Sequence, residues 1–422
     1  MTSNKPYLPW LMWFFPLAFF GFQFILRLFP GLIMPELLQK YQISATDFGL
    51  FASLYYLGYA GMQIPMALLL DRYGPRQIIA FSAMLCGLSV WMMLTFDSWG
   101  VALMSRLLIG VGSVVGFLGT SKVISMWFAK EKYARLVGLT FSFGLLGALY
   151  GGRPVSMLIG QIGWEKMLGL LGLVAFLLGL FNYSFVRNNS TFNINAASST
   201  NILADLKGLY KLKSLLILAF ANFLMVGSLE GFADVWGVPY LMAARDLTKT
   251  QAASITSFVF VGMLFGGPIL AYLSEKFKAH YNVTMIAGLL MALLMIMVLV
   301  FNQELSQATL MFIMFLIGIL CCYQVIVFAI GQELVPPGLM SVTIAFLNCI
   351  NMLGGSFFHS SIGRLMDFFE MSPMVDGVTV YSASTYTCAL AIVPIASLLG
   401  SVLVWLSKRK NKRELLSLEV TY

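Results

Sequence analysis

Charged side chains are scarce in this sequence. Aspartate, glutamate, lysine and arginine together make up 10% of its 422 residues, against about 25% in an ordinary soluble domain. Hydrophobic residues make up 59% of the chain, and its mean hydropathy is +0.86. This composition excludes a soluble globular protein. Apolar runs of about 18 residues or more, separated by short polar loops, indicate membrane-spanning helices rather than a β-barrel.

Histidine and cysteine are also few. Two histidines cannot form a histidine-based metal site, and the five cysteines lack the paired spacing of a zinc site or a disulfide framework. All five fall within apolar runs: Cys86, Cys321, Cys322, Cys349 and Cys388. The sequence contains no nucleotide-binding loop and no catalytic triad. We therefore expect no enzyme, no cofactor and no metal.

We predict an all-α membrane protein with twelve transmembrane helices, each long enough to cross the bilayer once. The predicted spans are 10–35, 46–70, 77–95, 99–126, 135–160, 165–187, 214–242, 250–274, 282–301, 306–334, 338–365 and 382–407. The polar stretch 188–213 is predicted to be a cytoplasmic linker. Its second part, ILADLKGLYKLK, has the pattern of a short amphipathic helix on the membrane surface.

The basic residues fall mainly on one side of the predicted membrane. An even number of spans puts both termini on one side, and most loop lysines and arginines lie there. The opposite loops hold only Lys40, Lys166, Arg245 and Lys249. The positive-inside rule then places both termini in the cytoplasm. The net charge of +8 is therefore a topology signal that needs no nucleic-acid partner, and compact loops favour a bacterial inner membrane.

The two halves of the chain match weakly, in the same orientation. The matched pairs include Pro35 with Pro239, Leu37 with Leu241, Thr46 with Thr250, Asp71 with Glu275, and Arg72 with Lys276. This indicates a parallel repeat of six helices plus six. We predict a first six-helix bundle at 1–187, the linker at 188–213, a second bundle at 214–407, and a basic cytoplasmic tail at 408–422.

Short motifs relate the chain to a family. DRYGPR (71–76) resembles the cytoplasmic loop signature G-x-x-x-D-R-x-G-x-R of the major facilitator superfamily, with Ala67 in place of the first glycine. RLLIGVG (106–112) resembles its R-x-x-x-G-x-G signature, and GLLGALYGGRP (144–154) resembles its fifth helix. The resemblance covers essentially the whole chain. It implies secondary transport by alternating access and does not fix the substrate.

The loop motif supplies the predicted gate. Charges at the end of the second span can pair with neighbouring helix ends and hold the two halves together on one side. Substrate or ion binding would then bias this latch. The predicted gating residues are Asp71, Arg72, Arg76, Glu275 and Lys276. The alternative is a topology signal with a tight turn at Gly74 and Pro75.

Charges inside the spans mark the candidate binding site, because a charge at bilayer depth is costly. Arg27, Arg153 and Glu230 each lie about 24–27 Å along a helix that starts on the cytoplasmic side, at about 1.5 Å per residue. Asp234 follows Glu230 by four residues and Gln23 precedes Arg27 by four, so each pair shares a helix face. We predict that this layer of charges crosses a central cavity.

Such a layer suits a zwitterion. Arginine holds a carboxylate through two parallel hydrogen bonds, while Glu230 or Asp234 can hold an ammonium group or carry a coupling proton. Arg106 is a third candidate for proton coupling, because the resemblance implies a role in structure or coupling for the arginine of the fourth span. Further substrate contacts are predicted at Tyr55, Tyr59, Gln63, Tyr323, Gln324, Asn348 and Asn351.

Each of these charges has a plainer alternative. Arg27 can extend toward the outer interface or pair with Glu36, and Arg153 can bond a backbone carbonyl. Glu230 and Asp234 can form a structural pair with the arginines. Buried polar groups also hold transmembrane helices together without binding a solute.

Two other charged residues within spans are assigned peripheral roles. Lys122 lies five residues before Trp127 and either extends to the cytoplasm or lines the cavity floor. Arg364 lies three residues before Asp367, and we expect the two to pair near the outer surface.

A subfamily resemblance narrows the substrate. The first-span arginine followed by proline and P-E-L, with DVWGVPYL (234–241), is similar to bacterial amino-acid transporters of intracellular pathogens and to the lysosomal dipeptide-transporter branch. The same arginine also resembles that of organophosphate and organic-anion antiporters. We predict a monomeric secondary transporter of an amino acid or short peptide, with protons as the candidate coupling ion. The alternatives are an organic-anion or sugar-phosphate carrier, a siderophore or drug exporter, and a transporter-like membrane sensor.

Overall fold

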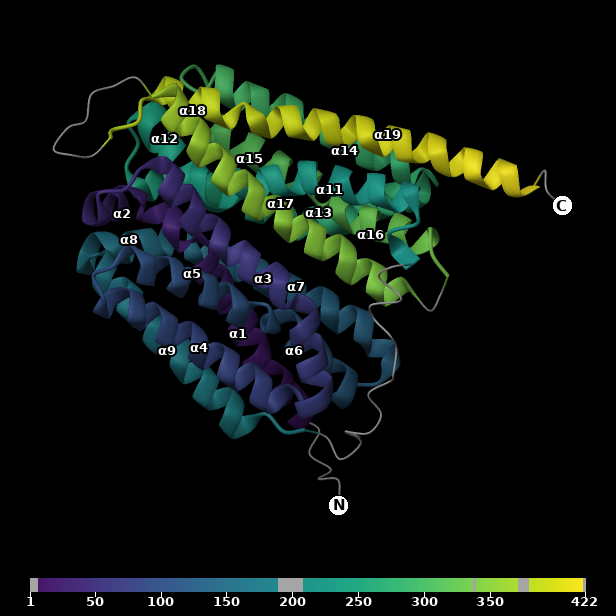
Figure 1. Cartoon of the computed structure of the whole chain (residues 1–422), viewed down its shortest axis with the longest axis horizontal. Coiled ribbons are helices and arrows are strands. Elements are labelled where there is room, and N and C mark those ends of the chain that lie inside the picture. Colours follow the sequence, from purple (N-terminus) through teal and green to yellow (C-terminus); the bar gives the residue numbers. More distant parts are fainter. Residues whose placement is uncertain (1–6, 189–207, 337–338, 371–378, 420–422) are drawn as a thin grey trace. The chain divides into compact units, whose positions relative to one another are not determined.

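The computed structural model describes residues 7–188, 208–336, 339–370 and 379–419. All regular structure in these residues is helical (Figure 1). The predicted all-α fold is therefore confirmed. Most of the predicted linker, residues 189–207, lies outside the described residues, as does most of the amphipathic segment expected there.

Eleven helical segments of the described chain are long and apolar enough to cross a membrane. Six are single helices: α1 (Leu8–Leu32), α4 (Pro75–Thr95), α9 (Trp164–Phe185), α13 (Lys249–Lys276), α14 (His280–Val300) and α17 (Met340–Phe369). The other five are interrupted: α5–α6 (Trp99–Ser113, Val115–Trp127), α7–α8 (Lys130–Gly151, Arg153–Ile162), α11–η2–α12 (Lys213–Gly231, Phe232–Trp236, Gly237–Arg245), α15–α16 (Gln307–Cys321, Tyr323–Glu333) and α18–α19 (Ala383–Leu390, Ile392–Glu419).

The remaining predicted span, 46–70, is the helix α3 (Ala45–Tyr73), which is 29 residues long. Tyr55, Tyr56, Tyr59 and Gln63 lower its hydropathy, so it falls short of the other eleven in apolar character while exceeding most of them in length. A short helix, α2 (Met34–Tyr41), precedes it. We did not predict α2, because its eight residues are too few to register as a span.

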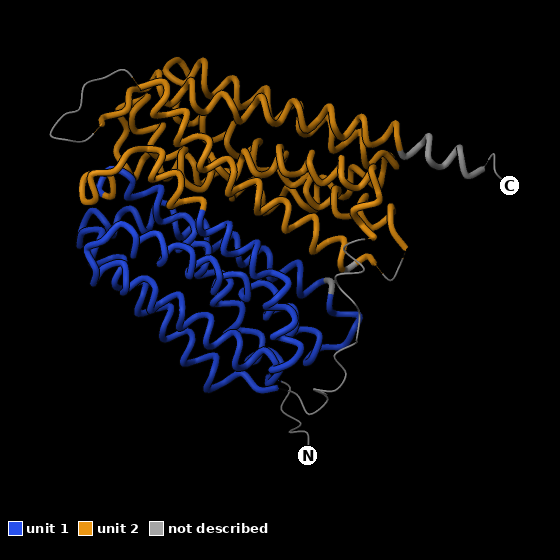
Figure 2. Tube along the Cα trace, viewed as in Figure 1, with its two compact units in different colours: residues 1–36, 54–199 blue, residues 37–53, 200–422 orange. Residues whose placement is uncertain are grey.

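Residue contacts divide the chain into two compact units (Figure 2). The first unit holds residues 1–36 and 54–199, and the second holds residues 37–53 and 200–422. The boundary crosses α3, whose first turns pack in the second unit. The predicted division instead keeps all of this helix in the first bundle. The division into six helices plus six remains a prediction.

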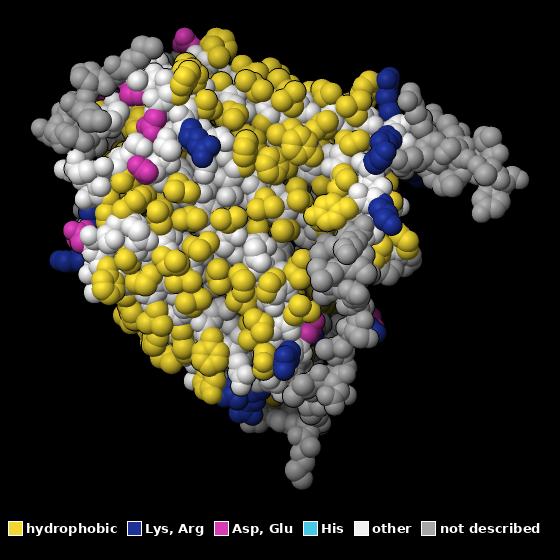
Figure 3. Space-filling model, viewed as in Figure 1, with side chains coloured by type: hydrophobic (Ala, Val, Ile, Leu, Met, Phe, Trp, Pro, Cys, Tyr) yellow, Lys and Arg dark blue, Asp and Glu magenta, His cyan; other side chains and the backbone are white. Residues whose placement is uncertain are grey.

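Within each unit the helices pair in the same way. In the first unit α1 packs on α7, and α4 packs on α5 and α9. In the second unit α11 packs on α17, and α14 packs on α15 and α19. These pairs occupy equivalent places in the predicted repeat. Figure 3 shows hydrophobic side chains spread over the visible surface of each unit, with lysines and arginines near the helix ends, as suits a surface that faces lipid.

Glycines let α1 and α7 pack closely in the first unit. A Cβ atom at Gly147 would lie 1.9 Å from the carbonyl oxygen of Gly21. Only a residue without a side chain fits there, which explains the glycine-rich sequence of α7. Small residues let transmembrane helices pack backbone to backbone, and here they set the position of α1, the helix that carries Arg27.

Candidate functional site

In the first unit, α1 and α3 are joined by a buried hydrogen bond. The Tyr55 hydroxyl donates to Gln23 Oε1 at 2.5 Å, and both side chains are almost fully buried. Tyr59 lies one turn further along α3, with its ring centroid 6.3 Å from that of Tyr55. Gln63 continues this row, and its buried Oε1 accepts no hydrogen bond from the described residues. The structure thus groups four of the predicted substrate contacts.

Arg27 lies against aromatic rings rather than alone in the apolar run. Its guanidinium carbon is 4.9 Å from the ring centroid of Tyr56 and 5.6 Å from that of Phe24, and the side chain is partly buried. Contact with an aromatic face stabilises a cation in a partly desolvated place. Tyr56 was missed from the sequence, although it lies on the same side of α3 as Tyr59 and Gln63.

Arg106 is the buried centre of this group. Its Nη1 donates to the carbonyl oxygen of Leu26 at 2.7 Å and its Nη2 donates to that of Arg27 at 2.9 Å. Its guanidinium carbon lies 4.7 Å from the ring centroid of Tyr55. A Cβ atom at Gly110 would lie 2.1 Å from the Tyr55 carbonyl oxygen. The R-x-x-x-G motif therefore fastens α5 to both α1 and α3.

Arg153 does not join this group. It is exposed, and no hydrogen bond or ion pair of the described residues involves it. The helix is interrupted just before it, because α7 ends at Gly151 and α8 begins at Arg153. The depth of Arg153 was counted along one unbroken helix, and its neighbourhood with Arg27 stays a prediction.

In the second unit, the acidic residues lie beside a break in helical geometry. Residues 232–236 form a π-helix, η2, with the Gly237 amide donating to the Phe232 carbonyl. Glu230 precedes it and is partly buried, while Asp234 lies within it and is almost fully buried. A π-turn contains an extra residue, and the shared helix face of the two acids stays a prediction. Such turns often occur at functional sites.

Glu230 lies near the break in the tenth span. Its charge interacts with Cys321, where α15 ends, and with Tyr323, where α16 begins. The Tyr323 hydroxyl is buried and has no hydrogen-bond partner among the described residues. The neighbouring Gln324 is partly buried. A carboxylate and an unpaired hydroxyl thus lie where two interrupted helices meet.

The predicted asparagines lie on α17, which packs against α11. Asn351 is fully buried, and neither atom of its amide has a hydrogen-bond partner in the described chain. Asn348 is partly buried. A buried amide left without partners is costly, so Asn351 is a candidate to bind a water molecule or a polar solute.

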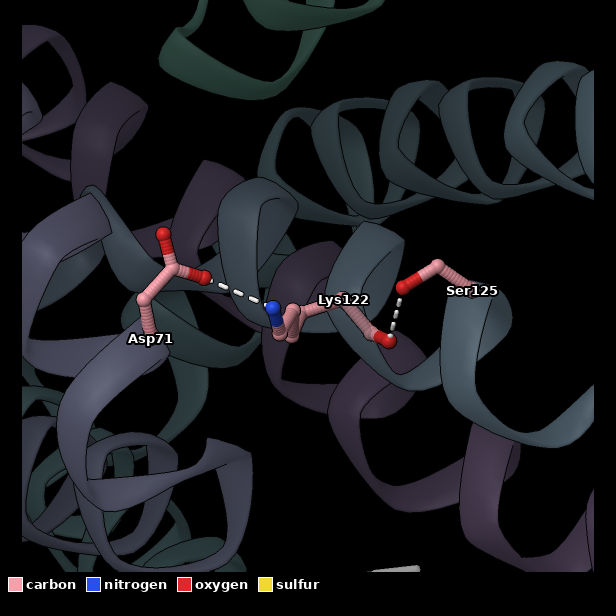
Figure 4. Close-up of polar contacts among 3 residues, drawn as sticks. All are labelled: Asp71, Lys122 and Ser125. Atoms are coloured by element: carbon pink, nitrogen blue, oxygen red, sulfur yellow. Dashed lines mark hydrogen bonds and ion pairs between the residues drawn. The ribbon is translucent and has the colours of Figure 1, made fainter. Parts of the chain in front are cut away.

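The predicted gate motif makes its contacts inside the first unit. Lys122 Nζ lies 2.6 Å from Asp71 Oδ1, and the Ser125 hydroxyl bonds to the Lys122 carbonyl (Figure 4). Lys122 therefore pairs with the motif aspartate, a contact that the sequence did not reveal. Gly74, with φ of +82°, makes the tight turn into α4. Arg76 donates from Nε to the Tyr183 carbonyl at 2.8 Å.

The second copy of the motif is built differently. Glu275 and Lys276 are exposed, and Lys276 Nζ lies 5.5 Å from the ring centroid of Tyr272. The contact to another helix comes from His280. Its Nδ1 lies 2.6 Å from the Ser274 hydroxyl, and its Nε2 lies 3.7 Å from Glu333 Oε1. Histidine replaces Arg76 at this place of the repeat.

The amino end of α3 is capped by α17. The Asp367 carboxylate accepts from the Ala45 amide at 3.2 Å and from the Thr46 amide at 2.8 Å, and Tyr381 donates to it at 2.5 Å. Burial and the hydrogen bond to Asp367 raise the pKa of Tyr381. The expected pair of Arg364 with Asp367 is not formed among the described residues, because the carboxylate is occupied by this cap.

Many apolar spans with a few charges held between helices define the protein as a multi-pass membrane protein of the transporter kind. The family model of the Major Facilitator Superfamily matches residues 13–359. The chain belongs to this superfamily, and the predicted family is thus confirmed.

Individual relatives are distant. The uncharacterized transporter YybO of Bacillus subtilis is 23% identical over 375 residues, covering 81% of this chain and 85% of the relative. The hexuronate transporter of the same species is 25% identical over 244 residues, covering 56% of this chain and 58% of the relative. A bacterial homologue of the lysosomal transporter Spinster, solved in an inward-facing, unoccupied conformation, has 14% identity and a TM-score of 0.74, covering 96% of each chain.

Proposed function

We propose that the protein is a secondary active transporter that moves a small, carboxylate-bearing polar solute by alternating access. The first candidate is a zwitterionic amino acid or short peptide, with protons as the coupling ion. The observation that carries the proposal is Arg27, a permanent cation inside an apolar span, held between aromatic rings. A guanidinium binds a carboxylate in two parallel hydrogen bonds.

The second unit supplies the complementary chemistry. Glu230, whose charge interacts with Tyr323, can hold the ammonium group of a zwitterion or carry the coupling proton. Asp234, buried in the π-helix, is the second candidate for either role. Asn351 and Tyr323 have unused hydrogen-bonding atoms that suit the backbone of a peptide or the hydroxyls of a sugar.

The second candidate function is transport of an organic anion such as a sugar acid. It is favoured by the hexuronate transporter among the relatives. The requirement for Arg27 is the same in both cases, because both solutes carry a carboxylate. They differ at Glu230, which a plain anion does not need for binding. Drug or siderophore export has no corresponding feature among the described side chains.

Solute counterflow in proteoliposomes tests the proposal, because exchange at equilibrium needs no proton gradient. The panel contains amino acids, dipeptides, hexuronates and sugar phosphates. We expect Arg27→Gln to lower counterflow of every accepted solute at least tenfold, while Arg364→Gln, an exposed arginine, leaves it unchanged. Equal exchange by these two variants would overturn the proposal.

The same assay separates the two candidates. Glu230→Gln is expected to lower counterflow of a zwitterion and to spare that of an organic anion, with the exposed Glu304→Gln as the matched control. Binding of a solute without any exchange would instead indicate a sensor. Net uptake that is unaffected when the proton gradient is collapsed would exclude proton coupling.

We also propose that the protein works as a monomer in a bacterial inner membrane with both termini in the cytoplasm. The basis is the asymmetry of lysine and arginine between the two sets of loops. Alkaline phosphatase is active only outside the cytoplasm, so fusions report the side of a loop. A fusion after Asp97 should be active and one after Lys408 inactive, and the reverse pattern would refute this orientation.

A further inference from the structure

The helix α1 contains a proline close to Arg27. Pro30 lies inside α1, which continues to Leu32. In an α-helix the amide of one residue donates to the carbonyl four residues earlier, and proline has no amide hydrogen. The carbonyl oxygen of Leu26 therefore lacks its donor in the helix ladder. In a membrane core no water replaces it, so such a carbonyl is costly if it stays unpaired.

Arg106 provides the missing donor. Its Nη1 binds the Leu26 carbonyl at 2.7 Å, and its Nη2 binds the next carbonyl, that of Arg27, at 2.9 Å. The side chain is 2% exposed, so water does not compete for these bonds. The flat guanidinium presents two parallel donors, which matches two successive carbonyls of one helix turn.

We infer that Arg106 is a positioning residue that repairs the helix interruption at Pro30 and thereby fixes the direction of the Arg27 side chain. It acts through the backbone of α1 and does not contact the solute. Tyr55 also helps to hold α1 in place. Its ring lies under the Arg106 guanidinium, and its hydroxyl donates to Gln23, which lies one turn before Arg27.

The role expected of Arg106 changes accordingly. An arginine does not lose its proton in a protein, and both terminal nitrogens of this one, Nη1 and Nη2, donate to carbonyl groups. Arg106 is thus poorly suited to carry a coupling proton. The assignment of Arg27 as the contact for the carboxylate rests on the proposed function, whereas the repair of α1 does not.

A double-mutant cycle with Pro30 tests the repair. Pro30→Ala restores an amide donor for the Leu26 carbonyl, which has room for two donors, so this variant alone should behave like the wild type. Arg106→Ala should lower the folding equilibrium constant by about tenfold to a hundredfold, the usual effect of losing a charged donor to a buried acceptor. In the Pro30→Ala background that loss should shrink at least tenfold.

Pro16→Ala is the matched control, since Pro16 lies in the same helix and the carbonyl four residues before it, at Met12, is not bound by Arg106. It should not rescue Arg106→Ala. Folding is measured by thermal and chemical unfolding of the purified protein, with Arg106→Lys as a milder variant in case the alanine variant does not fold. Equal losses in the Pro30→Ala and Pro16→Ala backgrounds would overturn the inference.

Transport kinetics test the positioning of Arg27. Arg106→Ala should raise the KM for the transported solute more than it lowers kcat, and Pro30→Ala should restore the KM. If Pro30→Ala rescues the stability of Arg106→Ala but the KM stays raised, the positioning of Arg27 is refuted, whereas the repair of α1 by Arg106 still holds. A solute bound normally by Arg27→Gln would refute the proposed function and leave the stability cycle intact.

Discussion

Replacing Gly147 by alanine gives the sharpest test of the packing that positions α1. The new Cβ atom would lie 1.9 Å from the Gly21 carbonyl oxygen and 2.6 Å from its carbonyl carbon. Contacts of Cβ atoms below 3.0 Å hardly occur, so α1 and α7 must separate by at least about 1 Å. Both partners are backbone, and no change of rotamer can relieve the overlap.

The expected cost follows from the rigidity of this contact. Overpacking a well-packed core costs about 1–3 kcal/mol and occasionally more, and a clash between backbones belongs at the upper end. Gly138 lies in the same helix, and a Cβ atom added there would meet no other atom within 4 Å. At that position alanine should stabilise the helix by up to about 1 kcal/mol. The two variants should thus differ by about 3–4 kcal/mol.

The assay is thermal unfolding of the purified variants in one detergent, followed by tryptophan fluorescence. At about 2–4 °C per kcal/mol for a chain of a few hundred residues, the difference corresponds to a gap in Tm on the order of 10 °C. Gly147→Ala should also reduce solute counterflow, since Gly21 lies on the helix that carries Gln23 and Arg27. Equal Tm values for Gly147→Ala and Gly138→Ala would refute the reasoning.

Two further predictions concern the ends of α3. Asp71→Asn should lower uptake several-fold with little change in Tm, because the pair with Lys122 is exposed and such pairs contribute under about 1 kcal/mol. Exchanging the two charges should restore uptake, and a swapped variant no better than either single one would contradict the pairing. Asp367→Asn should lower the unfolding free energy by about 1–3 kcal/mol, since it loses a charged acceptor for two amides. The exposed Asp97→Asn should not lower it, and equal losses measured by thermal unfolding would count against the cap.

The spans were predictable because hydropathy and length are local properties of the chain. The predicted span 165–187 and the helix α9 (Trp164–Phe185) differ by two residues at most. Interruptions inside a span were harder to predict. Residues 232–236, FADVW, contain neither proline nor glycine, so no residue in the segment itself signals the π-helix that contains Asp234.

The grouping of candidate site residues was predictable only for residues that lie on the same helix. Gln23 and Arg27, one turn apart on α1, lie in one group as expected, and so do Tyr55 and Tyr59 on α3. Contacts between helices could not be inferred, because residue order does not state which helices meet. The pairing of Asp71 with Lys122 and the capping of the Leu26 carbonyl by Arg106 are both of this kind.

The two copies of the loop motif make different contacts. In the first unit an acid at the end of α3 meets a lysine on α6. In the second unit a histidine at the start of α14 meets Glu333 at the end of α16, and α14 corresponds to α4, not to α3, in the predicted repeat. The weak match between the two halves therefore did not reveal which side chains meet in the second copy of the motif.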